Sequence, residues 1–153
     1  MNLAVLLKKD NIFIREGYQD TDNFYNDFSF FLKRNEIINN NDKVKRLFIK
    51  RENVQSTAIG KGAAAPHIFS DEFAKFTFCM ALIKNGIDFK APDEKKVFLV
   101  FLIMSDEREV GSHLKALAHI ARLVSSTDIV EAIKKTSTPD EVLTIFKKKD
   151  QLI

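Results

Sequence analysis

Val97-Phe-Leu-Val-Phe-Leu-Ile-Met104 is the stretch that decides the fold, because its eight consecutive apolar residues leave no polar face. A strand with two apolar faces must be covered on both sides, so this run predicts the central strand of a sheet between two layers of helices. Residues 75–83 alternate in character and predict a second strand. The dipeptide Asn85-Gly86, which follows them, is typical of a turn.

Helical patterns surround these strands along the chain. Apolar residues recur at helical spacing, and capping residues stand where the helices are expected to begin. A short strand is also predicted at residues 12–14. The helices are expected to start at Asp20 or Thr21, at Asn41 or Asp42, at Ser112, at Thr127 or Asp128, and at Thr138-Pro139. This mixture predicts an α/β fold, a mixed β-sheet flanked by helices on both faces, as a single-domain sandwich over residues 1–153 with its core at about 3–149.

The composition is ordinary for a globular protein, with 45% apolar and 29% charged residues among 153. The net charge of +3 is too small to indicate a nucleic acid as partner. No apolar run approaches the roughly 18 residues of a membrane span, and the apolar stretch at the N-terminus is shorter than that of a signal peptide. We therefore expect a cytoplasmic protein with no direct membrane insertion. The single cysteine, Cys79, cannot form an internal disulfide, and its place on a predicted strand favours packing over thiol chemistry.

The candidate site begins with the segment Gly60-Lys-Gly-Ala-Ala-Ala-Pro66-His67. Pro66 restricts the backbone next to His67, and the two glycines permit a close approach of the backbone to a small anion. Neutral imidazole is a good nucleophile near pH 7, because its unperturbed pKa is about 6.5. These features indicate a histidine that carries a phosphoryl group on a ring nitrogen. The alternative is a histidine in a surface turn.

Arg51 and His113 are the candidate partners of His67. Arg51 projects from the end of a predicted helix and offers a planar, permanently charged fork that matches phosphate oxygens. His113 opens another predicted helix on the side of Leu117 and Ile120, so it should point toward packed structure, near N–H groups that favour an anion. The same helix end disfavours the imidazolium, which makes His113 a neutral hydrogen-bond donor. The alternatives are a surface arginine near a helix C-terminus and a half-buried histidine with its hydrogen bonds satisfied.

Other polar residues receive no chemical role. His119 lies on the polar side of its predicted helix, so we expect it to be exposed. Ser56 and Thr57 offer hydroxyl groups to an anion, although strand or turn structure explains them better. The sequence has no CxxC, no HxxxH with an acid beside it and no Walker loop, so no metal and no nucleotide cofactor is expected.

Several motifs taken together resemble one known family. They are Arg51-Glu52, Ser56-Thr57, Gly60-x-Gly62-x-Ala64-x-Pro66-His67 and Ser112-His113-Leu114-x-x-Leu117-Ala118, at steps of 16 residues from Arg51 to His67 and 46 residues from His67 to His113. This signature is similar to that of the EIIA domain, type 2 (fructose, mannitol and nitrogen-regulatory class), of the bacterial phosphoenolpyruvate-dependent phosphotransferase system (PTS). The resemblance covers nearly the whole chain and is far more specific than any single motif.

The resemblance implies a role for each candidate residue. His67 would be the phosphoryl acceptor, His113 the donor that stabilises the phosphoryl group by hydrogen bonding, and Arg51 the group that counters its charge. The protein would be a phosphotransferase component that takes a phosphoryl group from the small carrier phospho-HPr and passes it to an EIIB component in sugar uptake. The alternative is a nitrogen-regulatory EIIA that binds regulatory target proteins according to its phosphorylation. Neither role requires a cofactor of its own.

The segment around the acceptor departs from the family pattern. The residue before Pro66 is usually a larger aliphatic one and here is Ala65, and Ile68-Phe69 follow His67 where a small residue is common. We expect at least one of Ile68 and Phe69 to be exposed and to belong to the docking surface for HPr and EIIB. The alternative is that both pack in the core.

Overall fold

The computed structural model describes residues 2–153. Its six strands are β1 (Ile12–Arg15), β2 (Ala58–Gly60), β3 (Ala63–Ala64), β4 (His67–Phe69), β5 (Thr77–Ile87) and β6 (Val97–Ser105). Its α-helices are α1 (Leu3–Leu6), α2 (Thr21–Arg34), α3 (Asn41–Val54), α4 (Val110–Ser126), α5 (Ile129–Lys134) and α6 (Pro139–Asp150). Short 3-10 turns span Lys9–Asn11 and Glu107–Glu109.

Strand β6 is the centre of the sheet, as the apolar run predicts. The strand order is β1-β5-β6-β3-β2, and β4 also pairs with β6. β5 runs antiparallel to β6, whereas β3 and β4 run parallel to it, and β1 runs parallel to β5. All but one residue of the 97–104 run are buried, so both faces of β6 are covered. The predicted mixed sheet with helices on both faces is confirmed.

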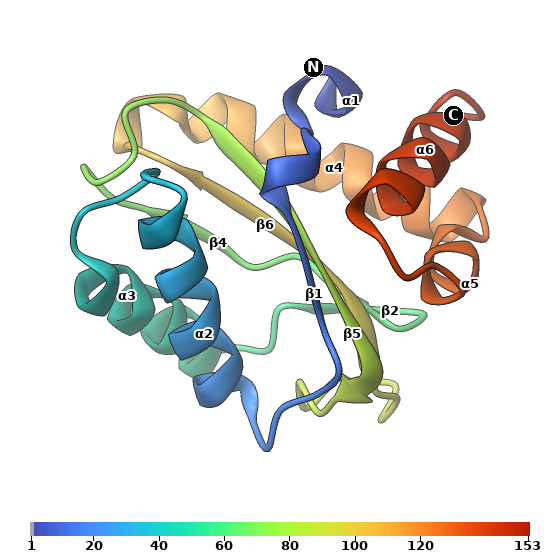
Figure 1. Cartoon of the computed structure of the whole chain (residues 1–153), viewed down its shortest axis with the longest axis horizontal. Helices are drawn as coiled ribbons and strands as arrows, with labels where there is room; N and C mark the ends of the chain where they lie inside the picture. Colours follow the sequence, from blue (N-terminus) through green and yellow to red (C-terminus); the bar gives the residue numbers. More distant parts are fainter. Residues whose placement is uncertain (1) are drawn as a thin grey trace.

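The two faces of the sheet are covered by different helices (Figure 1). On one face, α2 and α3 contribute an aromatic cluster in which Tyr25 stacks on Phe48 at 4.9 Å between ring centroids. On the other face, α1, α4, α5 and α6 pack against Phe78 and Phe101. Because alternate residues of β5 and β6 enter opposite clusters, the sheet separates two apolar cores.

Strands β3 and β4 form one run along β6 that is interrupted at Pro66. Ala64 lies opposite Val100 and His67 opposite Ile103, so three residues separate the pairs on both strands and the register is kept. Proline has no N–H to donate to the ladder, which breaks the strand at this point. The carbonyl oxygen of Pro66 still accepts a hydrogen bond from the N–H of Ile103 at 3.1 Å. His67 therefore begins a new strand in a fixed register.

The predicted turn at Asn85-Gly86 is wrong, because both residues lie inside β5. The pairing of β5 with β6 shifts between Leu82 and Ile87, which marks a bulge. Gly86 has φ +74°, and a Cβ there would lie 2.9 Å from the ring of Phe98. The glycine is thus needed for its backbone freedom and for close approach, but in a bulged strand rather than in a turn.

The helix starts agree with the predictions at most positions. Asp20 and Thr138 cap α2 and α6 as predicted, and Asn40, one residue before the predicted start, caps α3. The predicted cap at Ser112 is wrong, because α4 begins at Val110 directly after a 3-10 turn. The hydroxyl of Ser112 instead donates to the carboxylate of Glu109 at 2.6 Å.

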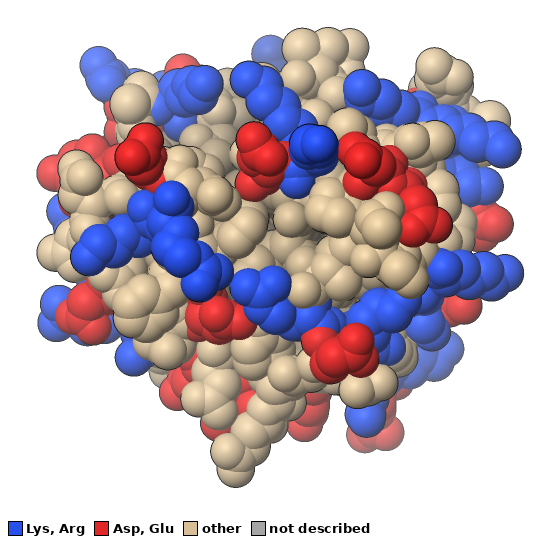
Figure 2. Space-filling model, in the orientation of Figure 1, with Lys and Arg blue, Asp and Glu red and all other residues tan. Residues whose placement is uncertain are grey.

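Charged side chains of both signs are interspersed over the face of the molecule in Figure 2. Several form ion pairs, among them Lys43 with Asp71, Arg46 with Asp42 at 2.7 Å, and Lys149 with Asp128 at 2.7 Å. In the part of the chain that the structure describes, no helix combines the length and the apolar character needed to cross a membrane.

Candidate active site

His67 is the first residue of β4 and is half-buried at the edge of the sheet. Successive side chains of a strand point to opposite faces. Ile68 accordingly enters the cluster formed with α2 and α3, whereas His67 and Phe69 point toward α4. Of the pair expected to provide at least one exposed side chain, Ile68 is buried, with an exposed fraction of 4%. Phe69 remains half-buried.

His113 lies in the first turn of α4 with an exposed fraction of 2%. Its ring centroid is 6.0 Å from that of His67, with the ring planes at 71°. Phe69 stacks on His113 at 4.2 Å and 25°, and the edge of Phe76 approaches at 5.6 Å and 88°. The prediction that His113 points toward packed structure is confirmed, and the fold brings the two histidines together.

Arg51 approaches His67 from the opposite layer of helices. It lies in the last turn of α3, and its Nη1 donates to the carbonyl oxygen of Gln55 at 2.8 Å. The positive charge of Arg51 acts on the ring of His67 and lowers its pKa. The two histidines therefore meet at the edge of the sheet where β4 begins, and the charge of Arg51 acts on this site from α3.

Glu52, the neighbour of Arg51, ties the end of α3 to the chain that leads into β2. Its carboxylate accepts hydrogen bonds from the hydroxyl of Tyr25 at 2.5 Å, the N–H of Thr57 at 2.6 Å and the hydroxyl of Thr57 at 2.7 Å. The hydroxyl of Ser56 donates to the carbonyl oxygen of Phe89 at 2.6 Å. Both hydroxyl groups that the sequence offers to an anion thus have partners within the protein. The network holds the backbone that carries Arg51 in place.

Both histidines of the site are neutral at pH 7. Burial lowers the pKa of His67, and the charge of Arg51 lowers it further. Burial also lowers the pKa of His113, to about 4, and the neighbouring His67 acts in the same direction while Glu109 opposes it. Desolvation disfavours the charged form of an imidazole, which explains the sign of both shifts. Burial, rather than the helix end, is the main cause that favours a neutral His113.

The pKa of His113 predicts a loss of stability in mild acid. In the unfolded chain the ring titrates near pH 6.5, and in the folded protein near 4. Below pH 6.5 the unfolded state binds the proton more readily, so the free energy of unfolding falls as the pH drops toward 4, by on the order of 3 kcal/mol. Urea unfolding of the wild type and of His113→Gln at pH 7 and 4.5 measures this term. His113→Gln should lose less stability than the wild type between pH 7 and pH 4.5. Equal losses in the two proteins would contradict the assignment.

The two glycines of the motif do not lie beside His67. Gly60 and Gly62 have φ +90° and +82° and form the turn between β2 and β3. The carbonyl oxygen of Gly62 accepts from the N–H of Leu99 at 3.2 Å, whereas His67 lies opposite Ile103. Four residues of extended strand separate these positions, which is about 13 Å. The glycines therefore shape the hairpin of β2 and β3, which precedes β4. The expected close approach of the glycines to an anion at His67 is wrong.

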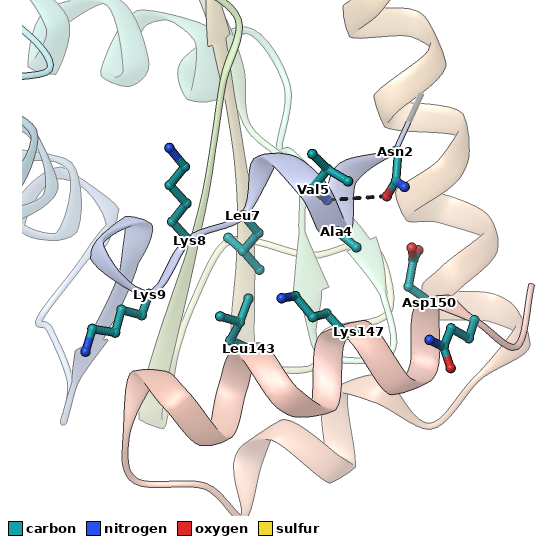
Figure 3. Close-up of a pocket in the computed structure, with 10 residues that line it drawn as sticks. Asn2, Ala4, Val5, Leu7, Lys8, Lys9, Leu143, Lys147 and Asp150 are labelled. Carbon is teal, nitrogen blue, oxygen red and sulfur yellow. Dashed lines mark hydrogen bonds between the residues drawn. The ribbon is translucent and has the colours of Figure 1, made fainter.

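The expectation of an exposed His119 is also wrong. Its side chain is 18% exposed, and Nε2 lies 2.5 Å from Oδ1 of Asp150 at the end of α6. Asp150 also lines a pocket of about 530 Å³ between α1 and α6 (Figure 3). Asn2 caps α1 at the rim of this pocket through a hydrogen bond from the N–H of Val5. His119 thus joins α4 to α6, and the pocket beside Asp150 is lined by none of the three candidate site residues.

Within residues 2–153, no cluster of three or more His, Cys, Asp or Glu side chains is arranged to hold a metal ion. Cys79 lies in β5 with an exposed fraction of 0%, which confirms its expected packing role. Burial raises the pKa of its thiol far above the usual range, so the thiolate is not formed near pH 7.

Two neighbours of His113 were not predicted from the sequence as parts of the site. Phe76 approaches the ring from the residues before β5, and the hydroxyl oxygen of Ser105 lies 2.6 Å from Nε2 of His113. Neither residue belongs to a recognisable motif. The one available signal for Ser105 is that a polar residue directly follows the apolar 97–104 run, at the end of a buried strand.

Comparison with known protein families gives one match over almost the whole chain. The family described as "Phosphoenolpyruvate-dependent sugar phosphotransferase system, EIIA 2" matches residues 5–149. A nitrogen regulatory protein of Bradyrhizobium diazoefficiens is 32% identical over 115 residues, which are 74% of this chain and 75% of that protein. The fructose-specific EIIABC component of Bacillus subtilis is 24% identical over 151 residues, and the chain spans about a quarter (24%) of its length.

Solved structures share the fold. The nitrogen regulatory protein IIA-Ntr of Neisseria meningitidis has a TM-score of 0.83 at 26% identity, over 94% of this chain and 97% of that one. The mannitol enzyme IIA of Escherichia coli, in a complex with phosphorylated enzyme IIB, has a TM-score of 0.75 at 19% identity, over 93% and 97% of the two chains. The second likeness concerns the fold alone.

Proposed function

This chain belongs to the EIIA type 2 family of the phosphoenolpyruvate-dependent sugar phosphotransferase system, and we propose on that basis that it carries a phosphoryl group on His67. Members of the family are phosphotransfer components. The proposed reaction takes the group from phospho-HPr and passes it to an EIIB component. We assign this role to residues 1–153 acting as one EIIA unit in the cytoplasm, with the core at about 3–149.

The convergence of three residues from different elements carries the proposal. His67 begins an edge strand, His113 faces it at 6.0 Å between ring centroids, and the charge of Arg51 acts on the same ring. A neutral nucleophile, a second imidazole and a guanidinium are the groups that receive a phosphoryl group and balance its charge. Burial, the main cause of the lowered pKa of both histidines, keeps the two rings neutral and available as nucleophile and hydrogen-bonding partner.

The enclosure of His67 indicates which of its nitrogens reacts. Its Nδ1 is buried and has no hydrogen-bond partner among the described residues, although the residue as a whole is half-buried. Nε2 is therefore the atom that we assign to attack. The bond from phosphorus to Nε2 forms as the bond to the donor nitrogen breaks, with the two nitrogens in line and charge spread over the three equatorial oxygens. Arg51 and an N–H of His113 stabilise that charge.

The relatives support two roles for the phosphorylated protein. Transfer to an EIIB component in fructose or mannitol uptake is supported by sugar-specific relatives and by the E. coli IIA structure in complex with phosphorylated IIB. Phosphorylation-dependent binding to regulatory target proteins is supported by the Bradyrhizobium and Neisseria relatives, which are nitrogen regulatory proteins. Both roles use the same chemistry at His67, and they differ in the protein that meets it next.

A reconstituted transfer assay tests the proposed function. The protein is incubated with phosphoenolpyruvate, Enzyme I and HPr, and its mass is measured under alkaline conditions that preserve phosphohistidine. We expect one added phosphoryl group, which a fructose- or mannitol-type EIIB removes if the role is uptake. A phosphorylated protein that no such EIIB discharges would favour the regulatory role. A protein that never gains the group in the presence of phospho-HPr would contradict the proposal.

Variants of Ile68 and Phe69 test which of these two side chains serves docking and which serves packing. Phe69 is half-buried and lines a surface pocket of about 480 Å³ together with Leu47 and Arg108, so we assign it to the docking surface. Phe69→Ala should weaken transfer from phospho-HPr through a higher apparent KM, with a small loss of thermal stability. Ile68→Ala should cost about 2–5 kcal/mol of stability, because Ile68 is buried in a core. Normal transfer kinetics in a folded Phe69→Ala protein would contradict the docking role.

A further inference from the structure

Ser105 connects the end of the central strand to the ring of His113. It is the last residue of β6, lies opposite Phe69 in the sheet and has an exposed fraction of 0%. Its Oγ lies 2.6 Å from Nε2 of His113. The same hydroxyl donates to the carbonyl oxygen of Asp106 at 2.9 Å. A buried hydroxyl thus has two possible acceptors within hydrogen-bond distance.

The single proton of this hydroxyl determines the tautomer of His113. A serine hydroxyl donates one hydrogen bond and accepts others, and a neutral imidazole has one N–H and one bare nitrogen. While Ser105 donates to Asp106, its oxygen can only accept from His113, so the ring proton lies on Nε2. The other ring nitrogen, Nδ1, is then bare. It is also buried, without a hydrogen-bond partner among the described residues.

This tautomer does not suit the role that His113 has in the proposed reaction. Nε2 is occupied by Ser105, so Nδ1 is the ring nitrogen left to contact a phosphoryl group on His67. Phosphoryl oxygens accept hydrogen bonds, and a bare nitrogen cannot donate one. His113 therefore stabilises the phosphoryl group only when the proton lies on Nδ1, which requires that Nε2 accept a hydrogen bond instead.

We propose that Ser105 is a positioning residue whose hydroxyl selects which nitrogen of His113 carries the proton. In the unphosphorylated protein, Ser105 donates to the carbonyl oxygen of Asp106 and His113 carries its proton on Nε2. When His67 is phosphorylated, the hydroxyl turns to donate to Nε2, and Nδ1 donates to a phosphoryl oxygen. One proton leaves Nε2 for water and one arrives on Nδ1 from water, so the ring stays neutral. The second half of this inference rests on the proposed function.

Nitrogen-15 NMR of the full chain, labelled at histidine, reads the tautomer directly through long-range couplings within each ring. In the unphosphorylated wild type we expect His113 with its proton on Nε2. Ser105→Ala should change that population, because the hydroxyl that accepts from Nε2 is lost. Ser105→Thr keeps a hydroxyl and should retain the wild-type population of the Nε2-protonated ring. Ser29→Ala is the matched control, since Ser29 has an exposed fraction of 0% and donates to a backbone carbonyl in α2 at 2.9 Å.

The kinetic measurement uses the same variants. Transfer from phospho-HPr to Ser105→Ala should be slowed about tenfold, short of the roughly 10²–10³-fold expected for loss of the His113 ring, and Ser29→Ala should transfer at the wild-type rate. On phosphorylation, the proton of His113 in the wild type should move to Nδ1. A resting wild type with the proton on Nδ1 would overturn the inference, as would identical tautomers in the wild type and Ser105→Ala. If His67 never becomes phosphorylated, the proposed function fails and the switch with it, while the resting tautomer still decides whether Ser105 sets the state of His113.

Discussion

Replacement of His67 by alanine should abolish phosphoryl transfer from phospho-HPr to this protein. The change removes the proposed nucleophile and leaves the sheet intact, because His67 is half-buried at the start of an edge strand rather than part of a core. No other side chain should replace it, since His113 is enclosed and engaged with Ser105. The measurement is the added mass of a phosphoryl group in alkaline solution after incubation with phosphoenolpyruvate, Enzyme I and HPr.

His119→Ala is the matched control for this experiment. It also removes an imidazole from the protein, but at the contact between α4 and α6. The variant should be phosphorylated like the wild type. Because it loses a partly buried pairing with Asp150, circular dichroism is first used to show that it is folded. An alkali-stable phosphoryl group on His67→Ala would end the assignment of His67 as the acceptor.

Removal of either supporting group should slow transfer strongly without loss of the acceptor. Arg51→Ala and His113→Ala each delete one group that stabilises charge in the transition state, and the loss of one such donor commonly costs about 10²–10³ in rate. Arg51→Lys should also be impaired, because an ammonium keeps the charge but loses the planar fork that matches phosphate oxygens. Single-turnover transfer from phospho-HPr, followed by rapid quenching, measures these rates.

The two variants must be compared with each other as well as with the wild type. His113→Ala opens space beside Phe69, so its thermal stability is measured alongside, and His113→Gln keeps more of the volume. If Arg51→Ala and His113→Ala both transferred at the wild-type rate while folded, neither residue would belong to the reacting pocket. Slow transfer in Arg51→Ala alone would limit the charge-stabilising role to the guanidinium.

The fold was predictable from the sequence wherever one element buries both of its faces or carries its own cap. The 97–104 run and the caps at Asp20 and Thr138 are local signals, and each lies where predicted. Asn85-Gly86 does not form the predicted turn, because a glycine at positive φ serves a bulge as well as a turn. Whether the glycine serves a bulge or a turn depends on the pairing of Ile87 with Val97. That contact forms only when β6 lies alongside β5.

The candidate site was predictable in its members but not in its surroundings. Helical periodicity placed His113 on the packed side, because that side is defined by apolar neighbours within one helix. The same reasoning placed His119 in solvent, since periodicity contains no information about α6, which covers it with Asp150. Ser105 is not predictable as a site residue for a related reason. Its contact with His113 joins the end of a strand to a helix across a 3-10 turn that no sequence pattern predicts.

The two helical layers hold opposite sides of the site, with Arg51 on α3 and His113 on α4 and the edge strand with His67 between them. A continuous fragment must therefore span α3 to α4 to contain all three residues. A piece that ends before α4 lacks one wall, and a piece that begins after α3 lacks the other. Phosphoryl acceptance should consequently be an all-or-none property of the assembled sandwich, lost in the same cooperative step in which the chain unfolds.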